Sequence, residues 1–441
     1  MESIAIQIVR RLHNAGFEAL FAGGCVRDRA LGKTPKDIDI ATSAHPEQIL
    51  EVFGKGEKVG AHFGVILLRE QGHHFEIATF RRDGEYEDGR HPSSVVFTDA
   101  REDAMRRDFT VNGMFYDPIE DRLIDYVDGS SDLKAGVIRA IGDPFDRFRE
   151  DHLRILRAIR LATSLEFKIE EETWNAVFGA AQSVASLPAE RIREELDKIW
   201  LHRNRVVGFD LLVESGLMEL LLPEIMELRG CEQPPQWHPE GDVFTHTRLM
   251  LSFLPDDASI PLVLSTLFHD IGKPATFTYD EADDRIRFNG HDKLGAEMAR
   301  SILNRLKYSN QVIEATTEAV SVHMKFKDVK KMRTATLKRF LARENFRDEL
   351  ELHRVDCLGS NGRLDNYDFV REKAAEFAAK PLIPPPFLTG KDLIDRELKP
   401  GPDFKEILFE AQDLQLEGNL TTRDDALQWL EEKITRLSED C

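Results

Sequence analysis

Two aspartates one residue apart, Asp37 and Asp39, are the first residues of this sequence whose types and spacing suggest chemistry. They lie in "FAGGCVRDRALGKTPKDIDIAT", residues 21 to 42. In an extended segment, residues i and i+2 point to one face, so the two carboxylates are expected side by side. Such a pair repels unless a cation lies between them, and hard oxygen ligands suit Mg²⁺. The spacing therefore predicts a magnesium site.

The residues before this pair suit a phosphate ligand. A turn at Gly23 and Gly24 lets the backbone approach a ligand closely, and the start of the following helix offers free N–H groups. Arg27 then pairs with a phosphate in fork geometry. Together with two metal ions that clamp the attacking and leaving oxygens, the segment predicts phosphoryl or nucleotidyl transfer.

A second constellation of histidines and aspartates occurs between residues 246 and 356. One histidine on an apolar helix is usually a core residue, but an adjacent His-Asp pair inside an apolar run, with similar groups around it, is not explained by packing. Imidazole and carboxylate ligands suit a divalent transition metal, which activates water for phosphoester hydrolysis. The residues of this constellation are His246, His269, Asp270, His291, His323 and Asp356.

The stretch "EDHLRILRAIR" gives a third pattern, in which Asp151 and Arg154 are expected on one helix face. One reading is an intrahelical ion pair. The other is selection of a base, because cytosine and adenine both present an amino donor beside a ring-nitrogen acceptor, and an Asp acceptor next to an Arg donor complements both. Uracil and guanine present the reverse order, which leaves both groups mispaired at a cost of about 1–3 kcal/mol each.

The elements that must hold these residues form an α+β part followed by an all-α part. We expect helices over residues 3–15 and 24–31 and strands over 17–22 and 36–41. "HFGVILLRE" and "HHFEIATFRR" are expected as strands joined near Gly72, and "DGEYEDGRHP" as a mobile loop. After about Ile141 the apolar spacing predicts nearly continuous helix to about Phe377. The divisions are 1–140, 141–235, 236–378 and 379–441, the last a Pro/Gly linker with a small helical tail.

The motif "GGCVRDRALG…KDIDIAT" resembles the signature of the nucleotidyltransferase superfamily, and more narrowly the bacterial class II tRNA nucleotidyltransferase and poly(A) polymerase family. The resemblance implies a nucleotidyltransferase head with a small mixed sheet, a helical neck and RNA-binding body, and catalytic metal-binding roles for Asp37 and Asp39. It also implies that "RRDFTVNG" contacts the ribose and the phosphates of the nucleotide and that "EDxxR" selects the base. The nucleotide-binding residues then expected are Gly23, Gly24, Arg27, Arg107, Asp108, Asn112, Asp151, Arg154 and Arg157.

The His/Asp series resembles the HD phosphohydrolase domain, which some bacterial members of the same family carry. This resemblance implies that the four metal-ligand positions fall on His246, His269, Asp270 and Asp356, with His291 and His323 extending the site to a second metal or to a phosphate. Both resemblances together cover about residues 15 to 360, and "LTGKDLIDRELKPGP" is also similar to the family. They imply addition of C, C and A to the 3′ end of tRNA from CTP and ATP, with Mg²⁺ at the head and a transition metal at the HD site. The segment "IATFRRDGEYEDGRHP" resembles the family's loop tied to the switch from C to A.

Charge and composition set the remaining expectations. The net charge of −20 argues against nucleic acid, but residues 321–347 hold nine Lys or Arg and two acids. On charge alone this strip is a solvated helix face; with the resemblance we expect RNA contacts from Lys325, Lys327, Lys330, Lys331, Lys338 and Arg339. Four cysteines without a CxxC pair and no membrane-spanning run predict a cytoplasmic protein. No protein partner is indicated.

Three alternatives to CCA addition stay open from the sequence. One is addition of A only, to tRNA ending in CC or as a poly(A) tail. A second is a hydrolase whose HD site does the main work, with the head binding RNA. A third is a non-catalytic RNA-binding module. The intact Asp37 and Asp39 pair argues against the last two, since a binding module has no need of both carboxylates.

Overall fold

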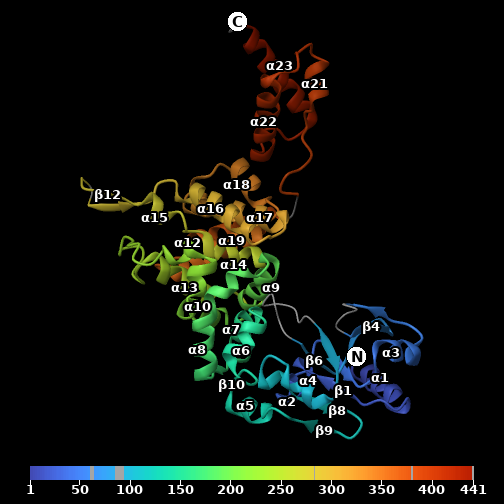
Figure 1. Ribbon diagram of the computed structural model, residues 1–441. Coiled ribbons are helices and arrows are strands. Elements are labelled where there is room, and N and C mark those ends of the chain that lie inside the picture. The colour runs from blue at the N-terminus through green and yellow to red at the C-terminus, as the bar shows by residue number, and fades with distance from the viewer. Residues whose placement is uncertain (60–63, 85–93, 283, 379–380, 440–441) are drawn as a thin grey trace. The chain divides into compact units, whose positions relative to one another are not determined.

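The computed structural model describes the chain except for residues 60–63, 85–93, 283, 379–380 and 440–441. Most of the loop expected in "DGEYEDGRHP" lies outside the described residues. The chain forms two compact units, residues 1–226 with 305–308 and residues 227–304 with 309–441 (Figure 1). The finer division into four parts stays a prediction.

The first unit begins with a mixed sheet, as predicted. Its strand order is β3-β4-β5-β2-β1-β8-β9, with β2 and β5 parallel and the other neighbouring pairs antiparallel. Strand β1 is entirely buried, and the sheet core includes Leu20, Phe80 and Phe115. The strands are β1 (Ala19–Ala22), β2 (Asp39–Thr42), β3 (Glu57–Lys58), β4 (Val65–Glu70), β5 (His73–Thr79), β8 (Phe115–Asp117) and β9 (Arg122–Ile124).

Short helices and one small ribbon accompany this sheet. Helix α1 buries Ile4, Ile8 and Leu12, four residues apart, which explains its amphipathic pattern. Helix α1 spans Glu2–Asn14. The other elements are α2 (Gly24–Ala30), α3 (Pro46–Phe53), α4 (Ala100–Met105), η2 (Thr110–Asn112), α5 (Gly129–Ala135) and the ribbon of β6 (Arg81–Asp83) with β7 (Val95–Phe97). The helices and strands expected over residues 3–41 are therefore confirmed to within a few residues.

The rest of the first unit is helical apart from the short parallel pair β10 (Val137–Ile138) and β11 (Lys168–Ile169). Asp143 caps the first helix and Pro144 begins it, which is favourable because the first helical N–H groups have no partner in the helix. The helices are α6 (Pro144–Glu150), α7 (Leu153–Leu165), α8 (Glu171–Ala180), η3 (Ala181–Ser186), α9 (Ala189–Trp200), α10 (Arg205–Glu214), α11 (Leu217–Leu221) and α12 (Pro223–Met226).

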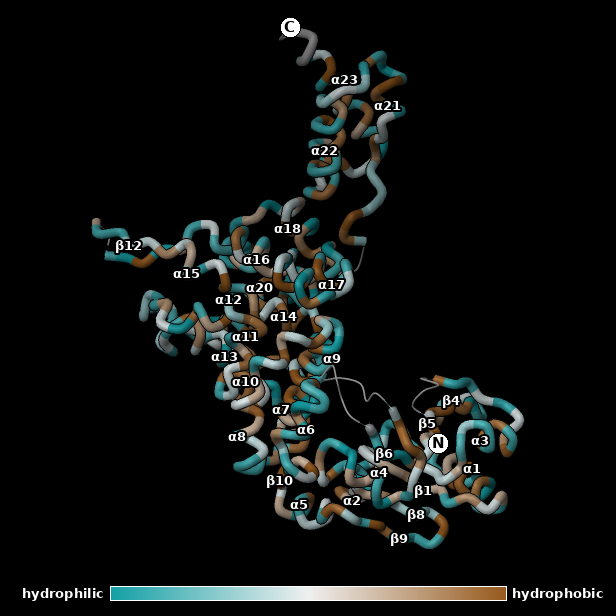
Figure 2. Tube along the Cα trace, viewed as in Figure 1, coloured by the Kyte–Doolittle hydropathy of each residue, from teal (hydrophilic) through white to brown (hydrophobic). Residues whose placement is uncertain are grey.

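The second unit is built around α14 (Ile260–Phe268), which is hydrophobic along almost its whole length (Figure 2). Its other helices are α13 (Val243–Phe253), α15 (Lys273–Thr276), α16 (His291–Arg305), α17 (Asn310–Val322), η4 (His323–Lys331), α18 (Thr334–Leu341), α19 (Phe346–Gly359) and α20 (Asp365–Phe377). The expectation of continuous helix misses one hairpin, β12 (Thr278–Asp280) with β13 (Arg285–Arg287). Alternation of polar and apolar residues in "TFTY" and "RIRF" favours extended backbone there.

The tail of the second unit has a small core of its own, in which Leu393, Ile407, Ala426 and Leu430 are buried. It contains α21 (Gly390–Ile394), α22 (Pro402–Glu417) and α23 (Arg423–Glu439), so the expected linker holds one short helix. Among the described residues, no helix is both long and apolar enough to cross a membrane.

Candidate functional site

The turn after β1 brings the predicted phosphate and metal residues of the head together. Gly23 has φ +73°, and a Cβ atom there would lie 3.4 Å from Arg107 Nη1 and 3.8 Å from Asp39 Oδ2. Glycine is favoured by this backbone conformation and by the close neighbours. The turn therefore joins Arg107, distant in sequence, to the carboxylate of Asp39.

Three carboxylates, those of Asp37, Asp39 and Glu76, form an acidic cluster near the start of β2. Asp37 precedes β2 and Asp39 begins it, so only the second belongs to the strand that was expected to hold both. The parallel register of Ile40 with Ile77 places Glu76 of β5 beside Asp39. Burial, then Asp37, then Glu76 raise the pKa of Asp39 to about 6, against a smaller opposing effect of Arg107. Crowded acids of this kind fit a divalent cation, which would relieve their repulsion.

Glu76 was missed by the sequence analysis. It is the outward-facing residue of "HFEIA", and only the pairing of β5 with β2 reveals that it lies beside the aspartates. The alternation of side chains along a strand predicts on which face of the sheet Glu76 lies, but not which residues of the next strand lie beside it.

Arg27 is held by two partners. Its Nη2 donates to Asp28 Oδ1 at 2.7 Å, and its Nη1 donates to Asn112 Oδ1 at 2.7 Å. The amide nitrogen of Asn112 in turn donates to Asp108 Oδ1 at 3.3 Å. The predicted phosphate residue of α2 is thus linked through Asn112 to the predicted ribose residue.

Asp108 is buried and has three partners within the first unit, Phe109, Asn112 and Arg157. Its Oδ1 accepts the Phe109 N–H at 2.8 Å, and its Oδ2 lies 3.1 Å from Arg157 Nη1 of α7. Burial alone would raise the pKa of Asp108, but the guanidinium groups of Arg157 and Arg154 lower it. Asp108 is therefore ionised at neutral pH and ties the head to the first long helix after it.

Arg107 is positioned by Asp103, a buried carboxylate that the sequence analysis did not single out. Arg107 Nη2 donates to Asp103 Oδ2 at 2.9 Å, and Arg106 Nη2 donates to Asp103 Oδ1 at 2.7 Å. The guanidinium of Arg107 also lies 4.9 Å from the centre of the Phe115 ring. These contacts orient Arg107 toward the Gly23 turn.

The expectation that Asp151 and Arg154 share a helix face is wrong. Asp151 has extended backbone (φ −138°, ψ 104°) at the break between α6 and α7, and its Oδ1 accepts the Leu153 N–H at 3.0 Å. Arg154 is buried in α7, and its Nη1 donates to Glu150 Oε2 at 2.7 Å. Arg154 therefore forms an ion pair with Glu150. Asp151 lies outside both helices, because its carboxylate accepts the Leu153 N–H at the start of α7.

The predicted RNA contacts divide into two sets. Lys325, Lys327, Lys330 and Lys331 are exposed on η4, where Lys331 pairs with Asp328 at 2.9 Å.

Lys338 and Arg339 on α18 contact the tail instead. Lys338 Nζ donates to the Leu416 carbonyl oxygen at 2.7 Å, and Arg339 pairs with Asp413. The charged groups of both side chains therefore bind α22 in this structure.

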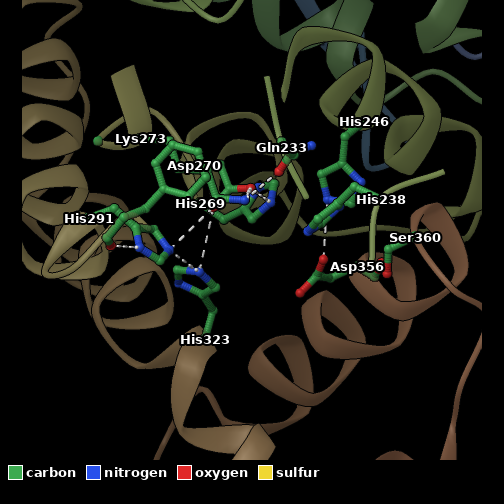
Figure 3. A network of polar contacts seen from close by, with 12 residues as sticks. Gln233, His238, His246, His269, Asp270, Lys273, His291, His323, Asp356 and Ser360 are labelled. Carbon is green, nitrogen blue, oxygen red and sulfur yellow. Dashed lines mark hydrogen bonds and ion pairs between the residues drawn. The ribbon is translucent and has the colours of Figure 1, made fainter. Parts of the chain in front are cut away.

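The His/Asp residues of the second unit converge as the sequence predicted (Figure 3). His246 comes from α13, His269 and Asp270 from the end of α14, His291 from the start of α16, His323 from the start of η4 and Asp356 from α19. A Cβ atom at Gly272 would lie 2.4 Å from the His291 carbonyl oxygen, so the glycine permits the start of α16 to pack against the His-Asp turn. Four of the six residues line a cavity of about 540 Å³ together with Trp237 and Lys273: Asp270, His291, His323 and Asp356.

The six residues form two groups of possible ligands. In each group the ligand atoms lie within 4.8 Å of one another: His246, His269 and Asp356 form one, and Asp270, His291 and His323 the other. Asp270 Oδ2 lies 3.0 Å from His269 Nε2 and Asp270 Oδ1 lies 3.4 Å from His291 Nε2, so this carboxylate joins the groups.

The histidine rings are oriented as metal ligands require. Nδ1 of His269, His291 and His323 lies 2.9, 2.7 and 2.6 Å from the carbonyl oxygens of Thr266, Phe288 and Val320. Since a ring N–H must donate to each carbonyl, Nε2 of each neutral ring carries the lone pair. His291 Nε2 and His323 Nε2 then face each other at 3.2 Å, an arrangement that a shared cation would relieve.

The charges of this cluster follow from its burial and its partners. Burial alone would raise the pKa of Asp270, but His269 and Lys273 hold it well below its usual range. Burial would lower the pKa of His246, whereas Asp356 and Glu240 raise it to about 9. Burial lowers the pKa of His323 to about 4. At neutral pH Asp270 is therefore ionised and His323 is neutral, which fits a divalent metal, while His246 would have to lose a proton to bind one.

Three family profiles match the chain. They are described as "Poly A polymerase head domain" (residues 19–139), "Probable RNA and SrmB- binding site of polymerase A" (residues 166–228) and "HD domain" (residues 243–356). Polymerase heads and HD domains generally bind metals, in agreement with the candidate ligand groups above.

Among curated relatives, the CCA-adding enzyme of Lactococcus lactis subsp. cremoris (strain MG1363) is 31% identical over 426 residues, covering 95% of this chain and 93% of that protein. The counterpart of strain SK11 is 43% identical over 225 residues, 50% of this chain and 56% of that protein.

Solved structures share the fold. The Bacillus stearothermophilus CCA-adding enzyme in complex with CTP has a TM-score of 0.77 at 24% identity, covering 99% of this chain and 98% of that one. The Thermotoga maritima CCA-adding enzyme complexed with tRNA-CCA has a TM-score of 0.61 at 19% identity, covering 98% and 95%. With a relative aligned over nearly its whole length, the chain belongs to the family of the CCA-adding enzymes.

Proposed function

We propose that the head of this chain adds C, C and A to the 3′ end of tRNA without a nucleic-acid template, using CTP and ATP and releasing pyrophosphate. The observation that carries the proposal is the acidic cluster of Asp37, Asp39 and Glu76 beside the Gly23 turn and Arg107. Relatives with the same fold are described in complex with CTP, ATP and tRNA.

Five residues of the head site are given roles in this mechanism. Asp37 and Asp39 would hold Mg²⁺, which when bound activates the 3′-hydroxyl and neutralises the phosphates. Arg27 and Arg107 orient the triphosphate so that the α-phosphate faces the 3′-hydroxyl of the RNA. Asp108 accepts a hydrogen bond from the ribose 2′-hydroxyl, which favours ribonucleotides. No covalent intermediate with the protein is needed.

Selection of the base falls to Asp151 and Arg154, the acceptor and donor that complement cytosine and adenine. Glu150 Oε2 lies 2.7 Å from Arg154 Nη1 and 2.9 Å from Arg147 Nη1, so this ion pair restrains the guanidinium of Arg154. Asp151 has extended backbone between α6 and α7. The alternatives of adding A only, or a poly(A) tail, use the same residues and differ in the number of nucleotides added.

We further infer that the second unit is a metal-dependent phosphohydrolase. The six convergent His/Asp residues favour this second activity, as does the direction of Nδ1 toward carbonyl oxygens in three of the histidines.

The exposed lysines of η4 are suited to contact the phosphates of an RNA backbone, and Lys327 lines the same cavity as the His/Asp residues. The cytoplasmic location stays a prediction.

Two variants separate the activities. Asp39→Ala is expected to abolish nucleotide incorporation and to leave metal-dependent hydrolysis of p-nitrophenyl phosphate unchanged. Asp270→Ala is expected to do the converse, because its carboxylate joins both groups of ligands in the second unit. Incorporation that survives Asp39→Ala would refute the head site, and hydrolysis that survives Asp270→Ala would refute the second.

A further inference from the structure

Glu240 is a buried carboxylate in the HD region that no sequence motif contains. It lies in the segment before α13, and its side chain is 8% exposed. Its Oε1 is 2.7 Å from His246 Nδ1 and 2.9 Å from His238 Nδ1, so two ring nitrogens converge on one oxygen.

These three side chains are close enough to be considered as a metal site of their own. The distances argue for hydrogen bonds instead, since 2.7 and 2.9 Å are the usual separations of a nitrogen donor from a charged oxygen. His246 Nδ1 also lies 3.2 Å from the Gly359 carbonyl oxygen, a second acceptor that requires a proton on the same nitrogen. Nδ1 of His246 is therefore the N–H donor.

A proton on Nδ1 determines what the other side of the ring does. When His246 is neutral, its lone pair is on Nε2, and Nε2 lies 3.2 Å from Asp356 Oδ1. The His246 ring is packed between His238 and His269, with ring centres 5.0 and 5.4 Å away (Figure 3). Glu240 thus sets both the tautomer and the direction of this imidazole.

We propose that Glu240 is a positioning residue of the HD metal site, holding His246 so that Nε2 is directed at the position shared with His269 and Asp356. His238 contributes by donating to the same Oε1 and so fixing the carboxylate. The ligand is a divalent transition metal, and the inference rests on the proposed metal site of the second unit. A carboxylate behind a histidine ligand orients the ring and raises its basicity, and its loss weakens metal binding by about 10–100-fold.

The test measures Mn²⁺ binding to the full chain by calorimetry. The part of the isotherm that is absent from Asp270→Ala is assigned to the second unit. Glu240→Ala is expected to weaken that part by about 10–100-fold. Glu240→Gln keeps an oxygen that accepts the Nδ1 proton and is expected to weaken it less. The matched control is Glu232→Ala, which removes an exposed carboxylate from the same segment and is expected to change nothing.

Three results would overturn the inference in distinguishable ways. If Glu240→Ala binds as tightly as the unmodified chain, Glu240 has no positioning role although the metal site exists. If Glu240→Gln loses as much affinity as Glu240→Ala while both unfold at the temperature of the unmodified chain, orientation through the oxygen is wrong. If the unmodified chain and Asp270→Ala give the same isotherm, the proposed metal site itself fails.

Discussion

Glu76→Gln tests whether the charges of the acidic cluster (Asp37, Asp39 and Glu76) are electrostatically coupled. Asp39 must be ionised to bind Mg²⁺, and its pKa is raised from an ordinary 3.8 to about 6. A raised pKa means that the proton returns as pH falls through about 6, so metal binding is lost on the acid side. At pH 7 about nine tenths of Asp39 is ionised and at pH 5 about one tenth.

The structure limits the size of the effect. Glu76 is the smallest of three causes that raise the pKa of Asp39, after burial and Asp37. Removing its charge should therefore lower the pKa by at most about one unit, out of a total rise of about two. We call the pH below which Mg²⁺ affinity falls the acid bend, and it is expected to move from about pH 6 toward pH 5. Mg²⁺ is also expected to bind more weakly at every pH, because one negative charge is gone.

The assay is incorporation of ATP into a tRNA transcript ending in CC, with the apparent Mg²⁺ dissociation constant determined from pH 5 to 8. Each profile is normalised to its own plateau at high pH. Glu57→Gln, an exposed residue on β3 of the same sheet, is the control and should keep the bend of the unmodified chain. An acid bend that stays in place in Glu76→Gln would refute the electrostatic coupling of Glu76 to Asp39.

Three further predictions concern the base selector, the link within the head and the tail. Asp151→Ala removes the acceptor for the exocyclic amino group, so discrimination against UTP and GTP in kcat/KM should fall by about 5–150-fold, equivalent to about 1–3 kcal/mol; unchanged discrimination would mean that another group recognises the base. Asn112→Ala breaks the link between Arg27 and Asp108 and should raise KM for CTP and ATP together by about tenfold, whereas an effect on one nucleotide alone would contradict a shared role. Asp413→Ala leaves Arg339 without its carboxylate and should destabilise α22 on α18 by about 1–3 kcal/mol, measured as faster amide exchange in α22; unchanged exchange would show that the ion pair does not hold the tail.

The sequence alone sufficed for residues whose chemistry depends on short spacing. Asp37 and Asp39 are found from two positions in one segment, and the His269–Asp270 pair from its place in an apolar run. The mixed sheet and the helical remainder follow from hydrophobic periodicity. These features are local, so no knowledge of distant contacts is needed.

Other features depend on how segments fold onto one another, which spacing and periodicity do not give. Glu76 becomes part of the head site only through the register of β5 with β2. Glu240 meets His246 because an irregular segment folds back onto α13. The side chain of Lys338 faces the tail instead of solvent because α22 packs on α18.

One local expectation also failed, for a physical reason. The spacing of Asp151 and Arg154 matches a helix face, but the Asp151 carboxylate caps the Leu153 N–H and the helix restarts after it. Asp competes for backbone donors at such positions, and spacing alone does not distinguish a cap from a helical pair.

The most direct measurement of the central claim is incorporation on two tRNA transcripts, one ending at the discriminator base and one ending in CC. Each receives Mg²⁺ with CTP alone, ATP alone or both, and the products are sequenced. The account predicts that the shorter transcript gains C, C and A in that order and stops, and that the longer one gains a single A. Long A tails, addition of A to the CC-ending transcript only, or no incorporation at all would contradict it.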